Sequence, residues 1–490
     1  MTLKLTRRAL LRGAGTSVLA WVAAAAPRSA AGVSPVTMRL STYMSEARRR
    51  ALPEPVVEAA KHHILDTLAA MVSGAELPPG RAALQLARAY GGAPVATVVA
   101  SDLVCGPAEA ALTNGMLAHA DETDDSHGPS RSHPGCAAVP AALATGEQHG
   151  IDGAHLLRSV ALGYDVGTRV SMSLGGPAYQ TLTHRSSHGM AGTFCAAAAA
   201  GSAAGLAPRE MRFLLDYAAQ QASGFAAWAR DVDHIEKAFV FAGRPAANGV
   251  IAAQLAGSGW TGVDDVFSGV DNFLEAFAPR ERGAVKGDPE VLVAGLGERY
   301  EVTRTNIKKW SVGSPIQAAL DALEIFFQRR PFTADQVKKV VVRMASDEVR
   351  TVDDRDLPDI CLQHMVAVML VDRTVSFAAS HDRARMNDPA VLRQRSKVEL
   401  LADQRIDARR PRREGIVEVT LTDGTQLSEW VRDVRGTADN PMTRAEVTAK
   451  ARDLMSPVLG GGRAELLVES VLGLEHVKDV RDLRPLLRRA

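Results

Sequence analysis

Apolar residues recur at the spacing of an α-helix through most of the first 300 residues. The segment VVEAAKHHILDTLAAMVSG (residues 56–74) places apolar side chains three and four positions apart and ends on glycine, which predicts a helix. Further alanine-rich segments follow, separated by short Gly, Pro and Asp breaks, and no alternating strand pattern interrupts them. The pattern predicts an all-helical domain over residues 40–300.

The pattern changes after residue 300. The segment QVKKVVVRMA (residues 336–345) is rich in β-branched residues, and GIVEVTLTDGTQLSEWV (residues 415–431) alternates around an Asp-Gly pair, which predicts a β-hairpin. Helical segments lie between these strands, and the tail returns to the helical period. We therefore predict a mainly α protein, in which an α+β domain (301–432) is inserted into a large helical domain and C-terminal helices (433–490) return to that domain.

The N-terminus has the pattern of an export signal. Arg7 and Arg8 precede an apolar run over residues 16–26, and small residues follow near positions 29–31. The run is too short to span a bilayer comfortably, and a paired arginine followed by leucines is typical of the twin-arginine route. We expect a signal peptide over residues 1–32 and a periplasmic mature protein with no membrane partner after signal removal.

Charge and cysteine usage exclude several functional classes. The formal net charge is +1, so bulk electrostatics gives no reason to expect binding to nucleic acid or to a membrane surface. The four cysteines lack the CxxC spacing of a thiolate metal site, and we expect no disulfide that matters. Cys195 lies in an alanine-rich segment, where a small buried thiol packs like alanine.

Titratable residues concentrate in one loop, HADETDDSHGPSRSHPG (residues 119–135), between two alanine-rich helical segments. A buried segment contains so many titratable side chains only where they bind each other or a ligand. We therefore interpret the loop as the wall of an active site. Its side chains could bind a metal ion, although HExxH and facial-triad spacings are missing. They could instead perform acid/base chemistry, or form a polar loop satisfied by its own hydrogen bonds.

Three further segments carry candidate residues. In THRSSHGMAGTF, His184 and His188 precede a helix of small residues, whose N-terminus would favour an anion; the alternative is a surface turn with a capping serine. Lys237 and Arg244 flank an apolar run, and Lys308 stands at the start of the predicted α+β domain. An isolated lysine is far more often a solvated surface group, but several cations near a histidine-rich loop would bind a polycarboxylate.

Together these four segments resemble the MmgE/PrpD (2-methylcitrate dehydratase) family, which also includes cis-aconitate decarboxylase and an iminodisuccinate epimerase. Four patterns of the family have counterparts here in the same order. The pattern HALDFDDTH…HPS corresponds to HADETDDSH…HPG, and HxxxxxGTFGAAAA corresponds to HGMAGTFCAAAA. A lysine before AGRAA corresponds to KAFVFAGRPAANG, and KxYPxxxxxHxxxDA corresponds to KKWSVGSPIQAALDA. The resemblance runs from about residue 46 to the C-terminus. It implies the architecture predicted above, a homodimer, and chemistry beside a carboxylate without a metal or an organic cofactor.

The resemblance assigns positions in the loop. The first aspartate of the family pattern falls on Glu122, with Asp121 as the adjacent alternative, and the threonine falls on Ser126, which keeps the hydroxyl. The histidine of the HP pair matches His133, with one extra residue before it.

The later segments match with two replacements. The next family histidine falls on His184 or His188, and both lysines match well. Gly313 stands where the family has a histidine five residues after the second lysine, and His364 stands where the family has a tyrosine.

These matches imply roles for the candidate residues. We expect His133 and His188 to be the acid and the base, with Glu122 orienting one of them, Lys237 binding the substrate carboxylate and Ser126 as a hydrogen-bonding group. The other substrate-binding candidates are Lys308, Arg244, His184 and His364. No metal ligand is expected.

We therefore expect a cofactor-independent lyase of the dehydratase type, 2-methylcitrate dehydratase-like, that acts on a small di- or tricarboxylate. The alternatives are an epimerase or isomerase that uses the same proton abstraction, and a non-catalytic periplasmic protein that binds carboxylates. Because Lys308 comes from the junction of the two domains, the active site should lie between them.

Overall fold

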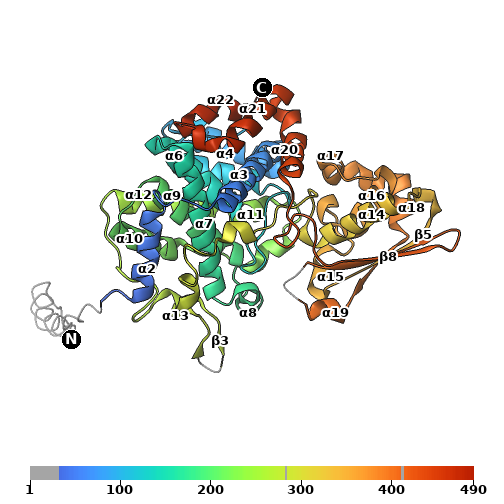
Figure 1. Ribbon diagram of the computed structural model, residues 1–490, viewed down its shortest axis with the longest axis horizontal. Helices are drawn as coiled ribbons and strands as arrows, with labels where there is room; N and C mark the ends of the chain where they lie inside the picture. Colours follow the sequence, from blue (N-terminus) through green and yellow to red (C-terminus); the bar gives the residue numbers. More distant parts are fainter. Residues whose placement is uncertain (1–31, 282–283, 410–412, 490) are drawn as a thin grey trace, which may run out of the picture.

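The computed structural model describes residues 32–281, 284–409 and 413–489. Figure 1 shows a large helical body beside a smaller body that contains a four-stranded sheet. One main hydrophobic core takes residues from 40–307 and 442–487, and the other takes residues from 310–434. The protein is therefore mainly α with a small sheet-containing domain, as predicted. The signal peptide predicted over residues 1–32 lies outside the described residues, except for its last position.

The helical body contains most of the helices, and the last helices of the chain pack on it. The helix α20 contacts α3 from the beginning of the chain, so the two ends of the sequence share one core. The helices of this body are α2 (Pro35–Glu46), α3 (Glu54–Gly74), α4 (Pro78–Tyr90), α5 (Pro107–Ala118), α6 (Gly135–His149), α7 (Gly153–Ser173), α8 (Tyr179–Thr183), α9 (Ser187–Ala203), α10 (Pro208–Gln221), α11 (Ile235–Ala238), α12 (Arg244–Gly257), α13 (Phe273–Phe277), α20 (Arg444–Leu459), α21 (Gly461–Leu472) and α22 (Arg484–Leu487).

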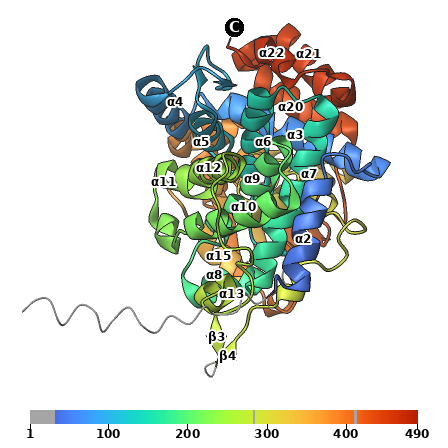
Figure 2. The same ribbon diagram turned by 90° about the vertical axis from the view of Figure 1, so that its left-hand side faces the viewer.

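The helix α9 lies at the centre of the helical body, between α6, α7 and α12 (Figure 2). Every residue of α9 is buried, and nearly all of its side chains are small, so its neighbours approach closely. Gly167 of α7 shows how closely: an added Cβ would lie 2.2 Å from Sγ of Cys195 and 2.4 Å from the carbonyl oxygen of Ala191. The abundance of alanine and glycine in the sequence is thus used to pack helix against helix.

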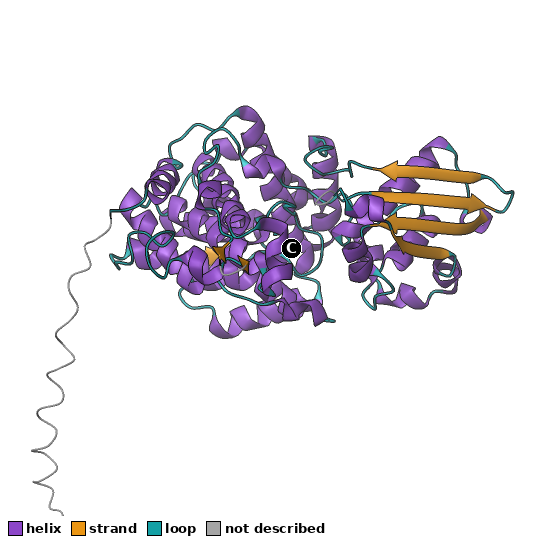
Figure 3. Cartoon of the chain, turned by 90° about the horizontal axis from the view of Figure 1, so that it is seen from below, coloured by secondary structure: helices purple, strands orange, loops and turns teal. Residues whose placement is uncertain are grey.

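The smaller body is built on a mixed sheet with the strand order β6-β5-β7-β8 (Figure 3). The pair β5–β6 is parallel, and the other two pairs are antiparallel. The turn between β7 and β8 contains Gly424 at φ +88°, a conformation that glycine adopts readily. The elements of this body are α14 (Gln317–Arg329), β5 (Val337–Met344), α15 (Ser346–Val352), α16 (Leu362–Asp372), α17 (Phe377–His381), α18 (Pro389–Arg395), β6 (Val398–Ala402), α19 (Gln404–Asp407), β7 (Gly415–Leu421) and β8 (Gln426–Val431).

The predicted strands are confirmed as β5, β7 and β8, but three other features differ from the sequence-based expectation. The strand β6 was not predicted, because it is a short edge strand whose residues are at best half-buried and show no clear alternation. The helical body also contains the two-residue pairs β1 (Ala96–Thr97) with β2 (Val104–Cys105), and β3 (Arg280–Glu281) with β4 (Ala284–Val285). Strands of two residues are too short to produce a period.

The four cysteines are free thiols, and all are buried. Burial raises the pKa of the Cys195 thiol, which packs among the small side chains of α9 and α7. Across the part of the chain that the structure describes, none of the helices combines the length and the apolar character needed to span a membrane.

Candidate active site

A cavity of about 750 Å³ lies where the two bodies meet. Its walls include Glu122, Ser126, His133, His188 and Lys237, which are the five residues that the sequence predicted to be catalytic. The opposite wall comes from the smaller body and from the segments that join it to the helical body. The structure thus brings the five candidates together from three separate segments of the helical body.

The loop over residues 119–135 is held in place from several sides. The Asp125 carboxylate accepts hydrogen bonds from the Tyr164 hydroxyl and the Gly135 amide, and its Oδ2 lies 2.8 Å from Nδ1 of His63. The backbone of Ser126 exchanges two hydrogen bonds with Asn306, at 2.8 and 2.9 Å. These contacts fix the loop to α3, α6, α7 and the segment that leads to the smaller body, as a preorganised site requires.

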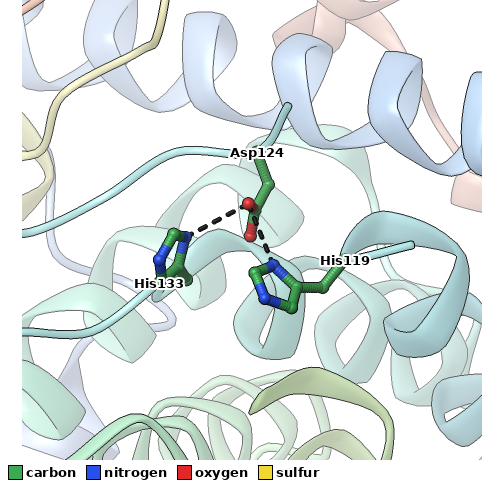
Figure 4. Close-up of side chains that lie close together, drawn as sticks. All are labelled: His119, Asp124 and His133. Carbon is green, nitrogen blue, oxygen red and sulfur yellow. Dashed lines mark hydrogen bonds and ion pairs between the residues drawn. The ribbon is translucent and has the colours of Figure 1, made fainter. Parts of the chain in front are cut away.

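The histidines of this loop separate into two groups. Both ring nitrogens of His127 face other side chains, because Nδ1 lies 2.8 Å from Ser130 Oγ and Nε2 lies 3.3 Å from Glu301 Oε2. In contrast, Nδ1 of His119 and Nδ1 of His133 both face Oδ1 of Asp124, at 3.0 and 3.1 Å (Figure 4). Because an ionised carboxylate only accepts hydrogen bonds, Nδ1 of His133 is the donor in this contact, and Nε2 is the ring nitrogen that Asp124 does not hold.

Asp124 is the ionised centre of this group. Burial would raise the pKa of its carboxyl group, but the neighbouring His119 and His133 hold that pKa well below its usual value. Burial lowers the pKa of His119, and Asp124 offsets only part of this effect. The result is a neutral imidazole beside a fixed carboxylate at neutral pH.

Glu122 forms ion pairs with two lysines. Lys237 donates a short hydrogen bond to Oε1, while Nζ of Lys308 lies 3.4 Å from Oε2 and donates to the carbonyl oxygen of Glu122 at 2.7 Å. Burial would raise the pKa of Glu122, but the two ammonium groups lower it well below its usual value. Of the two lysines, Lys237 lines the cavity, whereas Lys308 is buried behind Glu122 and does not line it.

Aromatic rings position His188 beside the lysine. Its ring stacks on Phe241 with a centroid distance of 3.7 Å, and Trp228 meets both rings edge-on. Phe241 lies in a π-helical turn, η3 (Phe239–Gly243), between α11 and α12, and such turns occur frequently at functional sites. Lys237 Nζ lies 5.3 Å from the Phe241 ring centroid. Burial lowers the pKa of His188 well below its usual value, with a further contribution from His133, so the ring is neutral.

Several residues at the site were missed by sequence reasoning. Asp124 and His119 lie inside the loop that the sequence singled out, and His234 lies three residues before Lys237 in another of its candidate segments. The arginines of the cavity wall come from separate elements and carry no common motif: Arg131, Arg304, Arg350, Arg355, Arg413 and Arg432. Arg304 is paired with Glu301 and Arg413 with Glu348, and six carboxylates line the same cavity, so its wall is mixed in charge.

Four predicted substrate-binding residues lie outside the cavity wall. His184 is an exposed residue at the C-terminal end of α8, and Arg244 donates its hydrogen bonds to Ser223. His364 lies in α16, where all of its neighbours along the helix are buried in the core of the smaller body. As described above, Lys308 acts on Glu122. The structure therefore does not bring these four residues to the cavity, and their contact with a substrate stays a prediction.

Two groups of side chains could in principle hold a metal ion, with donor atoms within 4.8 Å of one another: His119, Asp124 and His133, and His119, Glu122 and His234. In the first group, Asp124 contacts the two histidines of the same group. In the second group, a divalent cation bound to Glu122 would lie beside two ammonium groups and would be repelled by them. The second group therefore fits acid/base chemistry on an anion better than metal binding.

Two family models and several known proteins match most of this chain. The MmgE/PrpD N-terminal domain matches residues 38–284, and the MmgE/PrpD C-terminal domain matches residues 310–474. The cis-aconitate decarboxylase-like protein oryM of Aspergillus oryzae is 26% identical over 92% of this chain and 97% of its own length. The cis-aconitate decarboxylases of Aspergillus terreus and Homo sapiens are 25% and 24% identical, over 93% and 92% of this chain and 96% and 94% of their own lengths. With both domains matched in order along the chain, this protein belongs to the MmgE/PrpD family.

Proposed function

We propose that this protein is a lyase that acts on a di- or tricarboxylate by acid/base chemistry, without a metal or an organic cofactor. One observation carries the proposal: His133, His188 and Lys237 share one wall of a cavity, with Asp124 fixing the orientation of His133. This combination offers a base, a hydrogen-bonding group and a cation to the same bound molecule.

The chemistry follows from the protonation states. Nε2 of His133 is the ring nitrogen that Asp124 does not hold, so we assign to it the removal of a proton from the carbon next to a substrate carboxylate. Charge then builds on that carboxylate, and the ammonium group of Lys237 stabilises it. His188 lies 5.2 Å from His133, centroid to centroid, and its neutral ring forms a hydrogen bond to the departing group. In a dehydration, the proton that His133 has taken from carbon passes to the departing hydroxide and forms water. Acid/base catalysis of this kind contributes about 10²–10⁴-fold.

Two lyase reactions fit this site. In a dehydration, which we favour as the reaction of a 2-methylcitrate dehydratase-like enzyme, the departing group is a hydroxide that leaves as water. The second candidate is decarboxylation, in which carbon dioxide departs and the carbon takes up a proton. It is supported by the names of the relatives, all of which are cis-aconitate decarboxylases or resemble one.

Two alternatives use the same scaffold. An epimerase or isomerase would return the proton to carbon without losing a group. A non-catalytic binding protein would need cations but no neutral histidines, so the buried imidazoles of His133 and His188 favour an enzyme. We also propose that the enzyme acts in the periplasm on an imported or secreted acid, because residues 1–32 have the pattern of a twin-arginine signal.

Proton–deuterium exchange measured by NMR tests the function. Metal-stripped mature protein and its Lys237→Ala variant are each incubated in D₂O with a panel of di- and tricarboxylates. Water loss, loss of carbon dioxide, or exchange alone would identify a dehydratase, a decarboxylase or an isomerase, and the variant should be nearly silent. If the wild-type protein leaves every acid unchanged, with or without added divalent metal, the acid/base proposal is wrong.

A further inference from the structure

His234 is a buried histidine on the cavity wall that the proposed chemistry does not yet use. Along the chain, His234 lies between Trp228 and Lys237, which also line the cavity, and it directly precedes the short helix α11. Its side chain is 6% exposed, although the next residue, Ile235, is 44% exposed. The chain therefore turns this imidazole inward from a segment that is otherwise near the surface.

The backbone at His234 is held in an unusual conformation. Its φ is +62°, in the left-handed region that residues other than glycine, asparagine and aspartate seldom adopt. Such conformations cluster at ligand-binding and active sites, where the surrounding structure maintains them. Here the conformation directs the ring toward the catalytic loop, at a centroid distance of 5.2 Å from the ring of His119.

One ring nitrogen of His234 has no protein partner. Nε2 is buried and makes no hydrogen bond to any residue that the structure describes. A ring nitrogen of His234 also lies within 4.8 Å of a nitrogen of His119 and a carboxylate oxygen of Glu122. Buried polar atoms are normally satisfied, so an unsatisfied one beside a cavity indicates a place for a ligand atom.

Burial and the neighbouring charges keep the imidazole ring of His234 neutral. Burial lowers the pKa of His234 well below its usual value, Lys237 and His119 lower it further, and Glu122 and Asp121 oppose them. A neutral imidazole has one N–H group that donates a hydrogen bond to an oxygen without transferring its proton. The sequence adds a related observation, because Gly313, where the family pattern has a histidine, lines the same cavity.

From this geometry we infer that His234 is a substrate-binding residue whose neutral ring donates a hydrogen bond from Nε2 to an oxygen of the bound di- or tricarboxylate. The inference rests on the proposed function, since it assigns the ligand to the same cavity. It gives the site a donor that stands beside Lys237 but comes from a residue outside the motifs of the family pattern. Its removal should weaken substrate binding more than it slows the chemical step.

Three variants and two measurements test the inference. Titration calorimetry measures the binding of propane-1,2,3-tricarboxylate, and steady-state kinetics is measured with an acid that the wild-type enzyme converts. In His234→Gln the amide nitrogen stands near the position of Nε2 and restores a donor. In His234→Asn the left-handed backbone is tolerated but the amide is too short, and His234→Ala has no donor. We expect Kd and KM to rise about 10- to 100-fold in the Ala and Asn variants, with kcat changed far less, and to return toward wild type in the Gln variant.

The control is His155→Gln, which changes a half-buried histidine that bonds to the Ser202 carbonyl oxygen in the helical body. It should leave Kd and KM unchanged, and thermal unfolding checks that every variant is folded. Wild-type Kd and KM in the Ala and Asn variants would overturn the role of His234 alone. A wild-type protein that neither binds nor converts any polycarboxylate would overturn the proposed function, and the role of His234 with it.

Discussion

Nδ1 of His133 lies 3.1 Å from Oδ1 of Asp124, and this contact leaves Nε2 as the nitrogen of the ring that the carboxylate does not hold. Replacing Asp124 with asparagine keeps the shape but removes the charge that fixes the tautomer. We expect Asp124→Asn to lower kcat by about 10²–10⁴-fold, because the base loses its orientation and its electrostatic support. The rate of deuterium incorporation measures the effect, and circular dichroism should show an unchanged fold.

A matched control is Asp321→Asn. Asp321 is also buried and accepts hydrogen bonds from Trp310 Nε1 and the Arg435 amide, but it does not line the cavity. That variant should change stability and leave kcat near wild type. Equal losses of kcat in both variants would show that Asp124 has only a general structural role.

The two lysines on Glu122 should respond differently to removal. Lys237 lines the cavity, so Lys237→Ala should lower kcat/KM by about 10²–10³-fold, as loss of a group that stabilises developing charge does. Lys308 is buried behind Glu122, so Lys308→Ala should chiefly lower the free energy of unfolding, by about 3 kcal/mol, because it leaves a buried carboxylate less well compensated. Urea denaturation and steady-state kinetics on both variants separate the two roles; the reverse pattern would contradict the assignment.

The sequence predicted the part of the site that is local in the chain. Glu122, Ser126 and His133 lie in one loop, so their proximity follows from the sequence. Lys237 was singled out because it flanks an apolar run, and it also matches the family pattern. Burial of Lys308 and His364 depends on how distant elements pack, which no local pattern records. The division into two bodies was predictable because apolar residues repeat with a different period in helices and in strands. The edge strand β6 was not predictable, because its apolar residues show too weak an alternation to indicate a strand.

A contact between the two bodies should make stability depend on pH. Nε2 of His381, in α17, lies 2.8 Å from Oδ2 of Asp121 in the catalytic loop. Burial would lower the pKa of His381, but the carboxylates of Asp121 and Asp359 raise it to about 9 from its usual 6.5. Because the folded protein holds this proton more tightly, the stabilisation is fully present below pH 6.5 and is lost as the pH rises through 9.

Urea denaturation at pH 6, 7.5 and 9 measures this dependence, with His381→Gln as the comparison. The wild-type protein should lose its advantage over the variant as the pH rises across this window. A difference that stays constant from pH 6 to 9 would mean that the contact does not involve a protonated histidine.

Close packing of α7 against α9 should make Gly167 intolerant of any side chain. The Cβ of an alanine would meet Sγ of Cys195 and the Ala191 carbonyl oxygen well inside contact distance. We expect Gly167→Ala to lower the free energy of unfolding by about 1–3 kcal/mol, measured by urea denaturation. Gly461, at the start of α21, has open space around it, so Gly461→Ala should be neutral or stabilising.

Exposed apolar side chains near the cavity mark a candidate interface for the homodimer that the sequence led us to expect. Leu182, Phe225 and Val232 are 65%, 68% and 65% exposed, and Ile235 and Phe239 follow on the same segment. A β-bridge between Arg185 and Phe225 brings the end of α8 next to this segment, and we take these side chains together as one candidate patch. Apolar patches of this kind on a soluble protein commonly mark an interface, and we propose that a second copy of this chain covers it.

Light scattering of the mature protein, coupled to size-exclusion chromatography, measures the oligomeric state. We expect a mass of twice the mature chain, and a shift toward the monomer in the Phe225→Asp, Val232→Asp double variant, because buried unpaired carboxylates oppose association. Leu466→Asp is the control, since Leu466 is 53% exposed on α21, which lies at the opposite end of the helical body from α8 (Figure 1). A dimer that survives the double variant would place the interface elsewhere, and a monomeric wild-type protein would rule out the homodimer.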